Sequence, residues 1–266
     1  MRNRLIILGV GALVLMLLVL TFSVVRPMVI SHPMIKQSLV GFTSTVYSLN
    51  WAGYAVPAEK GTVTSVAGSF IVPGLSCSKA QTTYVALWAG LDGYNDSTVE
   101  QAGVLGECDH GKAYYYVWYE FYPSPAVFLS NMTAAPGDKV YVNVAYISSG
   151  NYFKINITIV PIRGKAVSSI LEGSVSGADL SSAECILERP EVNGHLSTLA
   201  NFGTAYYGQD YTSIPDTCYA TINGATEPFG SFPSVVSITM VNYNGEVLAY
   251  PSSLTSDGSS FTVTYG

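Results

Sequence analysis

Carboxylate side chains are the groups in this chain that could carry acid–base chemistry. The sequence has no G-x-S-x-G, no H-E-x-x-H, no Walker loop, and no D-T-G or D-S-G, which are short signatures of other catalytic classes. Its three histidines, His32, His110 and His195, have no serine motif near them. Asp and Glu are therefore the candidates, because a carboxylate can take a proton from water and later return it to a leaving group.

Four short motifs gather around one glutamine and a few acidic residues. They are W-A-G-L-D-G with Trp88 and Asp92, Q-A-G with Gln101, W-Y-E-F-Y-P with Trp118 and Glu120, and A-E-C-I-L-E ending at Glu188. Alone, Gln101 and Glu188 would be taken as surface residues and Asp92 as part of a turn. Glu120 is different, since a carboxylate among aromatic residues either faces solvent or has a partner and a function.

In this order and spacing the motifs resemble those of the glutamic peptidases, the eqolisin family. The resemblance covers about residues 50–266 and includes N-W-A-G-Y from Asn50 and V-A-G-S-F-I-V-P from Val66. It implies hydrolysis of polypeptide substrates by a Gln/Glu pair, with no metal or other cofactor. Carried over motif by motif, the catalytic residues fall on Gln101 and Glu188, and the supporting or substrate-binding residues on Trp88, Asp92, Trp118 and Glu120.

The implied pair suits amide hydrolysis in acid. Glu188 would activate water as a general base and then protonate the leaving nitrogen, which is most efficient near its own pKa. The Gln101 amide would donate a hydrogen bond to the developing oxyanion at any pH, an interaction typically worth about 3 kcal/mol of barrier. We therefore expect an acid endopeptidase.

Two other functions are compatible with a β protein of this composition. One is a non-catalytic carbohydrate-binding or adhesive domain that uses its 19 tyrosines as stacking surfaces. The other is a glycoside hydrolase with two carboxylates such as Glu120 and Glu188. The glutamine distinguishes the peptidase from both of these alternatives, because neither a carbohydrate-binding domain nor a glycoside hydrolase needs Gln101 beside a glutamate.

The pattern after residue 48 is β throughout. Phe153–Ile159 alternates apolar and polar residues, and the stretches 113–119, 140–146 and 261–265 are rich in β-branched and aromatic residues. Asn244-Gly245 between apolar flanks predicts a hairpin. We expect one all-β domain over 49–266, a sandwich or barrel on the pattern alone. The family resemblance implies a sandwich of two antiparallel sheets of the concanavalin A type.

The N-terminal residues predict export. Arg2 and Arg4 precede an apolar run from Leu5 to Val25, which reads as a helical signal peptide or signal-anchor over 1–26. The domain would then be secreted or held on the outer face of the cell membrane. Residues 27–48 form a connector or pro-segment. It is short compared with the propeptides of fungal members, so we do not expect it to inhibit the enzyme.

Charge and cysteine content complete the expectations. The net charge is −6 with no basic run, which argues against nucleic acid as a partner, and we expect a monomer. Four cysteines outside the cell favour two disulfides. Three pairings are possible, and we expect Cys77–Cys108 with Cys185–Cys218, because each pair brackets a local unit. A zinc site is not expected, since no C-x-x-C is present.

Overall fold

Long strands of aromatic, small and β-branched residues form the first of two layers. The computed structural model describes residues 28–38 and 45–266. Neighbouring strands of the first layer pair antiparallel. In spatial order they are β9 (Val127–Phe128), β8 (Lys112–Tyr122), β7 (Val99–Asp109), β6 (Thr83–Leu91), β13 (Ser182–Glu188), β4 (Trp51–Pro57) and β19 (Val236–Val241). The short strand β3 (Thr45–Ser48) runs parallel to β19, and β2 (Gln37–Ser38) pairs with β3.

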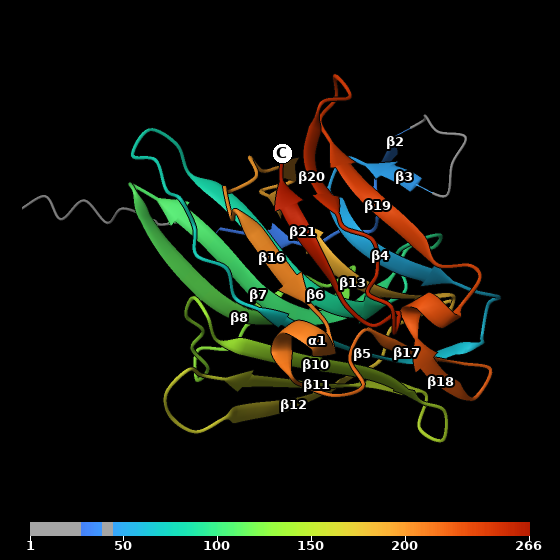
Figure 1. Ribbon diagram of the computed structural model, residues 1–266. Coiled ribbons are helices and arrows are strands. Elements are labelled where there is room, and N and C mark those ends of the chain that lie inside the picture. Colours follow the sequence, from blue (N-terminus) through green and yellow to red (C-terminus); the bar gives the residue numbers. More distant parts are fainter. Residues whose placement is uncertain (1–27, 39–44) are drawn as a thin grey trace, which may run out of the picture.

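The second layer packs against one face of the first, and Figure 1 shows β10, β11 and β12 stacked below β7 and β8. Its strands, in spatial order, are β12 (Val167–Gly173), β11 (Tyr152–Val160), β10 (Lys139–Ile147), β5 (Val63–Ile71), β16 (Thr204–Tyr207), β21 (Phe261–Tyr265) and β20 (Val247–Pro251). Strand β20 pairs with β19 and so joins the two layers. The architecture is all-β and consistent with a β-sandwich, and the concanavalin A type stays a prediction.

Smaller elements complete the described chain. Strand β17 (Tyr219–Ile222) pairs with β5 and with β18 (Ala225–Pro228). A separate small sheet consists of β1 (Ile30–Ser31), β14 (Glu191–Val192) and β15 (His195–Leu196). The helical elements are α1 (Gln209–Thr212) and the 3-10 turn η1 (Phe229–Ser231).

The strands expected from the sequence are confirmed. The stretches 113–119, 140–146, 153–159 and 261–265 lie within β8, β10, β11 and β21. Asn244-Gly245 lies in the hairpin between β19 and β20, where Gly245 has a φ of 82°, a conformation that suits glycine. The apolar run 5–25 lies outside the described residues. Within 28–38 and 45–266, no helix has the length and apolar character needed to cross a membrane.

The first layer buries both of its faces. Adjacent residues along a strand point to opposite faces, and this separates Leu87, Val104 and Val117 from their neighbours Trp88, Leu105 and Trp118. The first set belongs to the main core between the layers, and the second set belongs to a smaller apolar cluster. All three tryptophans of the chain, Trp51, Trp88 and Trp118, lie in this smaller cluster and are fully buried. We call the surface that carries them the tryptophan face.

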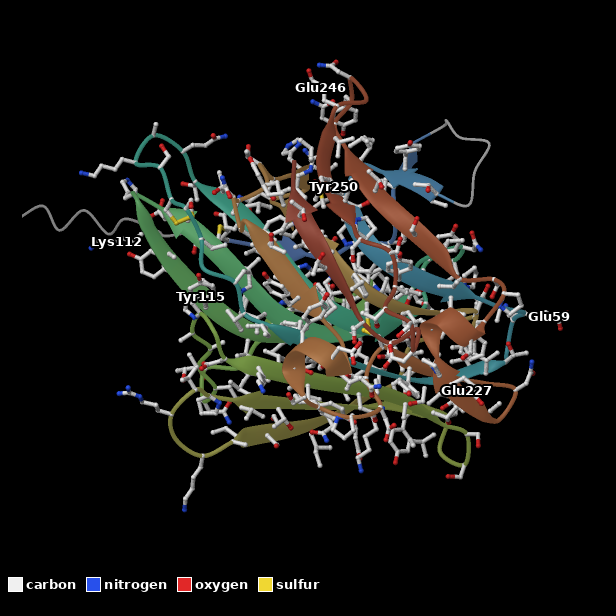
Figure 2. The ribbon with its side chains drawn as sticks, viewed as in Figure 1. Glu59, Lys112, Tyr115, Glu227, Glu246 and Tyr250 are labelled. Carbon is white, nitrogen blue, oxygen red and sulfur yellow. A yellow bond between two sulfur atoms is a disulfide. The ribbon has the colours of Figure 1, made fainter. Side chains whose placement is uncertain are left out.

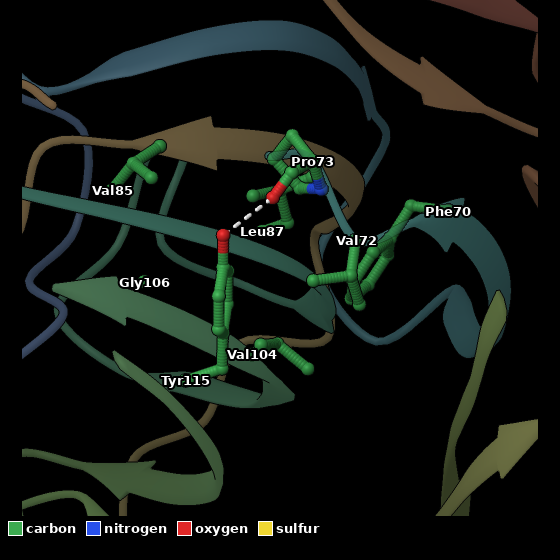
Figure 3. A pocket seen from close by; sticks show the side chains of 8 residues that line it. All are labelled: Phe70, Val72, Pro73, Val85, Leu87, Val104, Gly106 and Tyr115. Atoms are coloured by element: carbon green, nitrogen blue, oxygen red, sulfur yellow. Dashed lines mark hydrogen bonds between the residues drawn. The ribbon is translucent and has the colours of Figure 1, made fainter. Parts of the chain in front are cut away.

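The interior between the layers is a packed core. Figure 2 shows side chains filling this space, whereas the labelled Glu59, Glu227 and Glu246 lie at the edges of the molecule. Figure 3 shows an apolar crevice in which the Tyr115 hydroxyl donates to the Pro73 carbonyl at 2.9 Å. The crevice is too narrow to admit a water molecule. It is part of the packing between the layers.

One of the two expected disulfides is confirmed and the other is wrong. Cys77 and Cys108 are bonded, with Cα atoms 5.2 Å apart. Cys185 and Cys218 are neighbours, but they are separate thiols whose Sγ atoms are joined by a hydrogen bond of 2.9 Å. Both are fully buried in the main core. Burial raises the pKa of the Cys185 thiol well above its ordinary value.

The Cys77–Cys108 bond should stabilise the fold equally in acid and at neutral pH. The bond closes a loop of 31 residues, and restricting the unfolded chain in this way is worth about 3 to 4 kcal/mol. The double substitution Cys77→Ser with Cys108→Ser should lower the free energy of unfolding by that amount at both pH 3 and pH 7. Denaturant titration measures it, with the exposed neighbour Lys79→Ser as control. A loss confined to one pH would contradict the explanation.

Candidate active site

The register of four strands brings the motif residues to the tryptophan face. Gln101 on β7 lies opposite Glu120 on β8 and opposite Gly90 on β6. Glu188 on β13 lies opposite Ala86 of the same β6. Residues directly across a ladder share a face, and residues two apart on one strand do so as well. Gln101, Glu120 and Glu188 therefore point to one side, and all three are fully buried.

Small residues on β6 make room for these side chains. A Cβ atom at Gly90 would lie 2.8 Å from Cβ of Gln101 and 3.2 Å from the Trp88 ring. An alanine at position 90 would not fit without a shift of the neighbouring backbone and the indole, because its Cβ atom would make contacts this short. The glycine two residues after Trp88 thus lets the indole and the glutamine amide lie side by side.

Glu188 is held by an indole and an amide on an apolar surface. Trp88 Nε1 donates to Glu188 Oε2 at 2.8 Å, and Asn50 Nδ2 approaches Oε1 at 3.5 Å. Trp51 lies opposite Glu188 across the ladder and meets Trp88 edge to face at 4.9 Å. Burial raises the pKa of Glu188 well above its ordinary value, and the Trp88 and Asn50 hydrogen bonds act in the opposite direction.

Gln101 and Glu120 form a second unit on the same face. Gln101 Nε2 donates to Glu120 Oε2 at 2.9 Å. Because the amide nitrogen carries two protons, one remains free to reach another acceptor. Burial raises the pKa of Glu120, and the charge of Glu188 raises it further.

His32, from the segment before the domain, lies between these units. Its carbonyl oxygen accepts from Gln101 Nε2 at 2.8 Å, and its backbone N–H donates to Glu120 Oε2 at 3.2 Å. Its Nδ1 lies 3.2 Å from Glu188 Oε2. The imidazole stacks on Trp118, with ring centroids 3.6 Å apart. One residue thus contacts Gln101, Glu120, Glu188 and Trp118 together.

Asp92 lies apart from this group of side chains. Its carboxylate accepts the backbone N–H groups of Leu180 at 2.8 Å and Ser181 at 2.7 Å. These residues directly precede β13, so Asp92 fixes the start of the strand that carries Glu188. Of the residues predicted for the site, the structure brings together Gln101, Glu188, Trp88, Trp118 and Glu120. Asp92 influences the site by fixing the backbone just before β13, the strand that carries Glu188.

Three residues of the site were missed from the sequence: Asn50, Trp51 and His32. Asn50 and Trp51 belong to the N-W-A-G-Y motif, which carried the family resemblance but had no assigned role. The pairing of β4 with β13 places this motif next to Glu188. His32 was set aside because it precedes the domain. Nothing local in the sequence indicates that the chain folds back onto the tryptophan face.

The arrangement supplies acid–base groups and hydrogen-bond donors. Within residues 28–38 and 45–266, no group of three His, Cys, Asp or Glu residues is placed to hold a metal ion. A buried carboxylate beside a primary amide can activate water and stabilise an oxyanion.

The comparisons with known proteins agree with this chemistry. A family model described as the Peptidase A4 family matches residues 49–265. The chain belongs to the Peptidase A4 family. It is 32% identical over 250 residues to Aspergillopepsin-2 of Aspergillus niger, which covers 85% of this chain and 81% of that protein. The eqolisin resemblance predicted from the motifs is confirmed, and this glutamic peptidase is a hydrolase of peptide bonds.

Solved structures show the same fold for this glutamic peptidase. Scytalido-glutamic peptidase with a transition state analog inhibitor matches with a TM-score of 0.65 at 20% identity, covering 82% of this chain and 98% of that one. Aspergilloglutamic peptidase from Aspergillus niger matches with a TM-score of 0.57 at 27% identity, covering 69% and 99%.

The buried carboxylates of this peptidase should make its fold most stable in acid. Burial raises the pKa of Glu184 and Glu100 above the ordinary value and, with repulsion from Asp96, raises that of Asp92 to about 6. A folded-state pKa above the unfolded one stabilises the fold at low pH, and this contribution is lost as pH rises through the folded pKa. Unfolding free energy should therefore fall from pH 4 to pH 7.

A single substitution tests this explanation. Glu184→Gln should make the loss between pH 4 and pH 7 shallower by up to one proton, about 1.4 kcal/mol per pH unit. Denaturant titration at several pH values measures the slope. The exposed Glu59→Gln serves as the matched control and should leave the slope unchanged. Equal slopes in the wild type and Glu184→Gln would show that burial of this carboxylate does not set the pH dependence.

Proposed function

We propose that this chain is an exported acid endopeptidase in which Glu188 and Gln101 form the catalytic pair. The observation that carries the proposal is that both residues contact the same residue, His32. The Gln101 amide donates to the carbonyl oxygen of residue 32 at 2.8 Å. The Glu188 carboxylate lies 3.2 Å from the side chain of the same residue. A bound peptide therefore meets both groups at once.

Glu188 acts as the general base and then the general acid. Its carboxylate takes a proton from the attacking water and returns it to the leaving nitrogen when the C–N bond breaks. The apolar surroundings favour the neutral carboxyl group, whereas Trp88 Nε1 donates to the ionised form. The balance of these two effects sets the pH at which Glu188 can accept a proton.

Gln101 stabilises the oxyanion of the tetrahedral intermediate. One proton of Nε2 is directed to Glu120 Oε2 at 2.9 Å, which fixes the amide, and the other is directed to the peptide oxygen. A neutral donor fixed in this way requires little reorganisation during the reaction. Glu120 is therefore a positioning residue for Gln101, and Trp118 provides a flat surface for a substrate side chain.

The remaining parts of the proposal rest on the sequence. The apolar run 5–25 supports export and leaves secretion or attachment to the outer face of the membrane as the location. The domain boundaries 1–26, 27–48 and 49–266, and a monomeric state, are proposed on the same basis. The family match favours a peptidase over the carbohydrate-binding and adhesive alternative.

Substitution of either member of the pair should abolish most activity while the fold is kept. Glu188→Gln should slow cleavage of an unfolded protein at pH 2–5 by roughly 10²- to 10⁴-fold because the general base is lost. Gln101→Ala should slow it roughly 10²- to 10³-fold because the oxyanion donor is lost. Initial rates of peptide release measure both effects.

The matched control lies four residues before Glu188 on the same strand and face. Glu184→Gln removes a buried carboxylate that has no place in the proposed mechanism, and it should retain activity. Chelators and reagents against serine or cysteine enzymes should have no effect on the wild type. Loss of activity on chelation, or full activity of Glu188→Gln, would overturn the assignment.

Removal of the indole donor should shift the pH profile. In Trp88→Phe, the ionised form of Glu188 loses its 2.8 Å hydrogen bond, so the pKa of Glu188 rises and the acidic limb of kcat/KM moves to higher pH. Trp118→Phe changes an indole of the same face that donates nothing to Glu188 and should leave this limb in place. A shift common to both variants would indicate a general loss of packing.

A further inference from the structure

Four large apolar or aromatic side chains lie partly exposed at one end of the tryptophan face. They are Met28, Tyr114, Tyr116 and Phe128, between 38% and 43% exposed, and we call them the aromatic patch. Tyr114 and Tyr116 alternate along β8 and so share a face with Trp118, which lies opposite Phe128 of β9. The Phe128 ring meets the Tyr116 ring edge to face at 5.7 Å. The patch is therefore continuous over two neighbouring strands.

The aromatic patch surrounds an apolar hollow of about 300 Å³. The hollow is lined by Met28, Ile30, Leu105, Glu107, Tyr116 and Phe128. Glu107, the charged member, accepts a hydrogen bond from the Tyr116 hydroxyl at 3.1 Å, and the Tyr84 hydroxyl donates to the Met28 sulfur at 3.2 Å. An apolar centre with tyrosine hydroxyls beside it is the composition favoured at the boundary between lipid and water.

The patch lies at the point where the N-terminal apolar run joins the described chain. Arg26 and Pro27 are the two residues between Val25, which ends the run, and Met28 of the patch. Three steps between consecutive Cα atoms reach at most about 11 Å. In helical form the run 5–25 is long enough to cross the hydrocarbon core of a bilayer, about 30 Å. An anchor of this kind holds Met28 close to the lipid headgroups.

Met28 is also held close to the domain, because the residues after it are fixed. Strand β1 pairs with β14, and Asn193 N–H donates to the Val29 carbonyl at 2.9 Å. Further along, Ile35 N–H donates to the Gly93 carbonyl at 3.0 Å. A short connection on one side and a fixed segment on the other leave the domain little freedom to move away. The surface around Met28 is the surface that faces the bilayer.

We propose that the aromatic patch docks the domain on the outer surface of a lipid bilayer, with the uncleaved run 5–25 as its tether. This inference rests on the proposed export and attachment of the chain, and it goes beyond the peptidase chemistry. A tether keeps the patch and the lipid at a high local concentration, so a contact that is weak by itself suffices for docking.

The size of the patch favours lipid over a second copy of the chain. Its four side chains together expose roughly 300 Å². Each partner in a standard protein–protein interface buries about 800 Å². A patch of this size is too small to hold two domains together, whereas a tethered domain needs only a few side chains at the lipid surface.

Docking in this orientation leaves the proposed catalytic pair in water. Leu105 and Tyr116 lie opposite each other at the patch, and Gln101 and Glu120 lie opposite each other four residues further along the same two strands. Four residues of a strand span about 13 Å, whereas the headgroup region on each side of a bilayer is roughly 5–7 Å thick. The patch can therefore enter the headgroup region while polypeptide substrates still reach Gln101.

The test places a polarity-sensitive dye on the full-length chain in phosphatidylcholine vesicles. Tyr114→Cys carries the dye at the patch, and Tyr243→Cys carries it at a tyrosine that is 77% exposed in the β19–β20 hairpin. Glu246 of that hairpin lies well away from Lys112 at the start of β8 (Figure 2). The free thiols Cys185 and Cys218 are fully buried and stay unlabelled. We expect blue-shifted emission and loss of iodide quenching at position 114, with emission as in water at position 243.

A double substitution separates docking from tethering. Tyr116→Ser with Phe128→Ser removes the aromatic centre but keeps the run 5–25, so the dye at position 114 should regain iodide quenching. The matched control, Val247→Ser with Tyr250→Ser, changes two residues of similar exposure on β20 and should keep the dye protected. Circular dichroism checks the fold of both variants. Full protection in Tyr116→Ser with Phe128→Ser would show that the tether alone places the dye, and the docking surface would be wrong.

The remaining outcomes identify the occupant of the patch. Lipid with a spin label on its headgroup should quench the dye at position 114 and leave the dye at position 243 bright. A blue shift without this quenching would mean that a second copy or the run itself covers the patch, and would overturn the proposal. Loss of residues 5–25 from the exported protein, found by mass spectrometry, would overturn it as well. A docked protein without peptidase activity would contradict the proposed function and leave the docking surface intact.

Discussion

The burial of Glu188 on an apolar face is the constraint on which the rest of the structure depends. A carboxylate with no exposed surface favours its neutral form, and here three tryptophans and an isoleucine-rich cluster surround it. Within the described part of the domain, the side chains of Trp88 and Asn50 donate hydrogen bonds to it. This environment sets the pH at which the group exchanges a proton, because burial favours the neutral form while the hydrogen bonds from Trp88 and Asn50 favour the ionised form.

The same constraint requires a cover for the tryptophan face. The main core lies on the other side of the first layer, so the cluster around Trp51, Trp88 and Trp118 must be buried by something else. In the described chain, residues 28–38 contribute Ile30, His32 and Ile35 to that burial. A peptide bound to Gln101 and Glu188 would bury part of the same surface.

The sequence predicted the strands and the identity of the motif residues more readily than the contacts at the site. Alternation and turn residues placed β8, β10, β11 and β21, because period and turn chemistry are local properties. The motifs identified Gln101 and Glu188, but their common face depends on both β7 and β13 pairing with β6, which is a long-range property. The role of Asp92 in fixing residues 180–181 likewise depends on a loop far away in sequence. His32 was missed because its position follows from a chain reversal that has no local signal in the sequence. The second disulfide was wrong because two buried cysteines can lie next to each other, as Cys185 and Cys218 do, without being oxidised.

The most direct test of the catalytic pair is a crystal structure of the enzyme with a peptide that carries a tetrahedral hydroxyl group in place of the scissile carbonyl. We predict one oxygen of that centre within hydrogen-bond distance, about 3 Å, of both the Gln101 amide nitrogen and the Glu188 carboxylate. A peptide bound elsewhere, or one whose tetrahedral oxygens contact neither residue, would contradict this account of the active site.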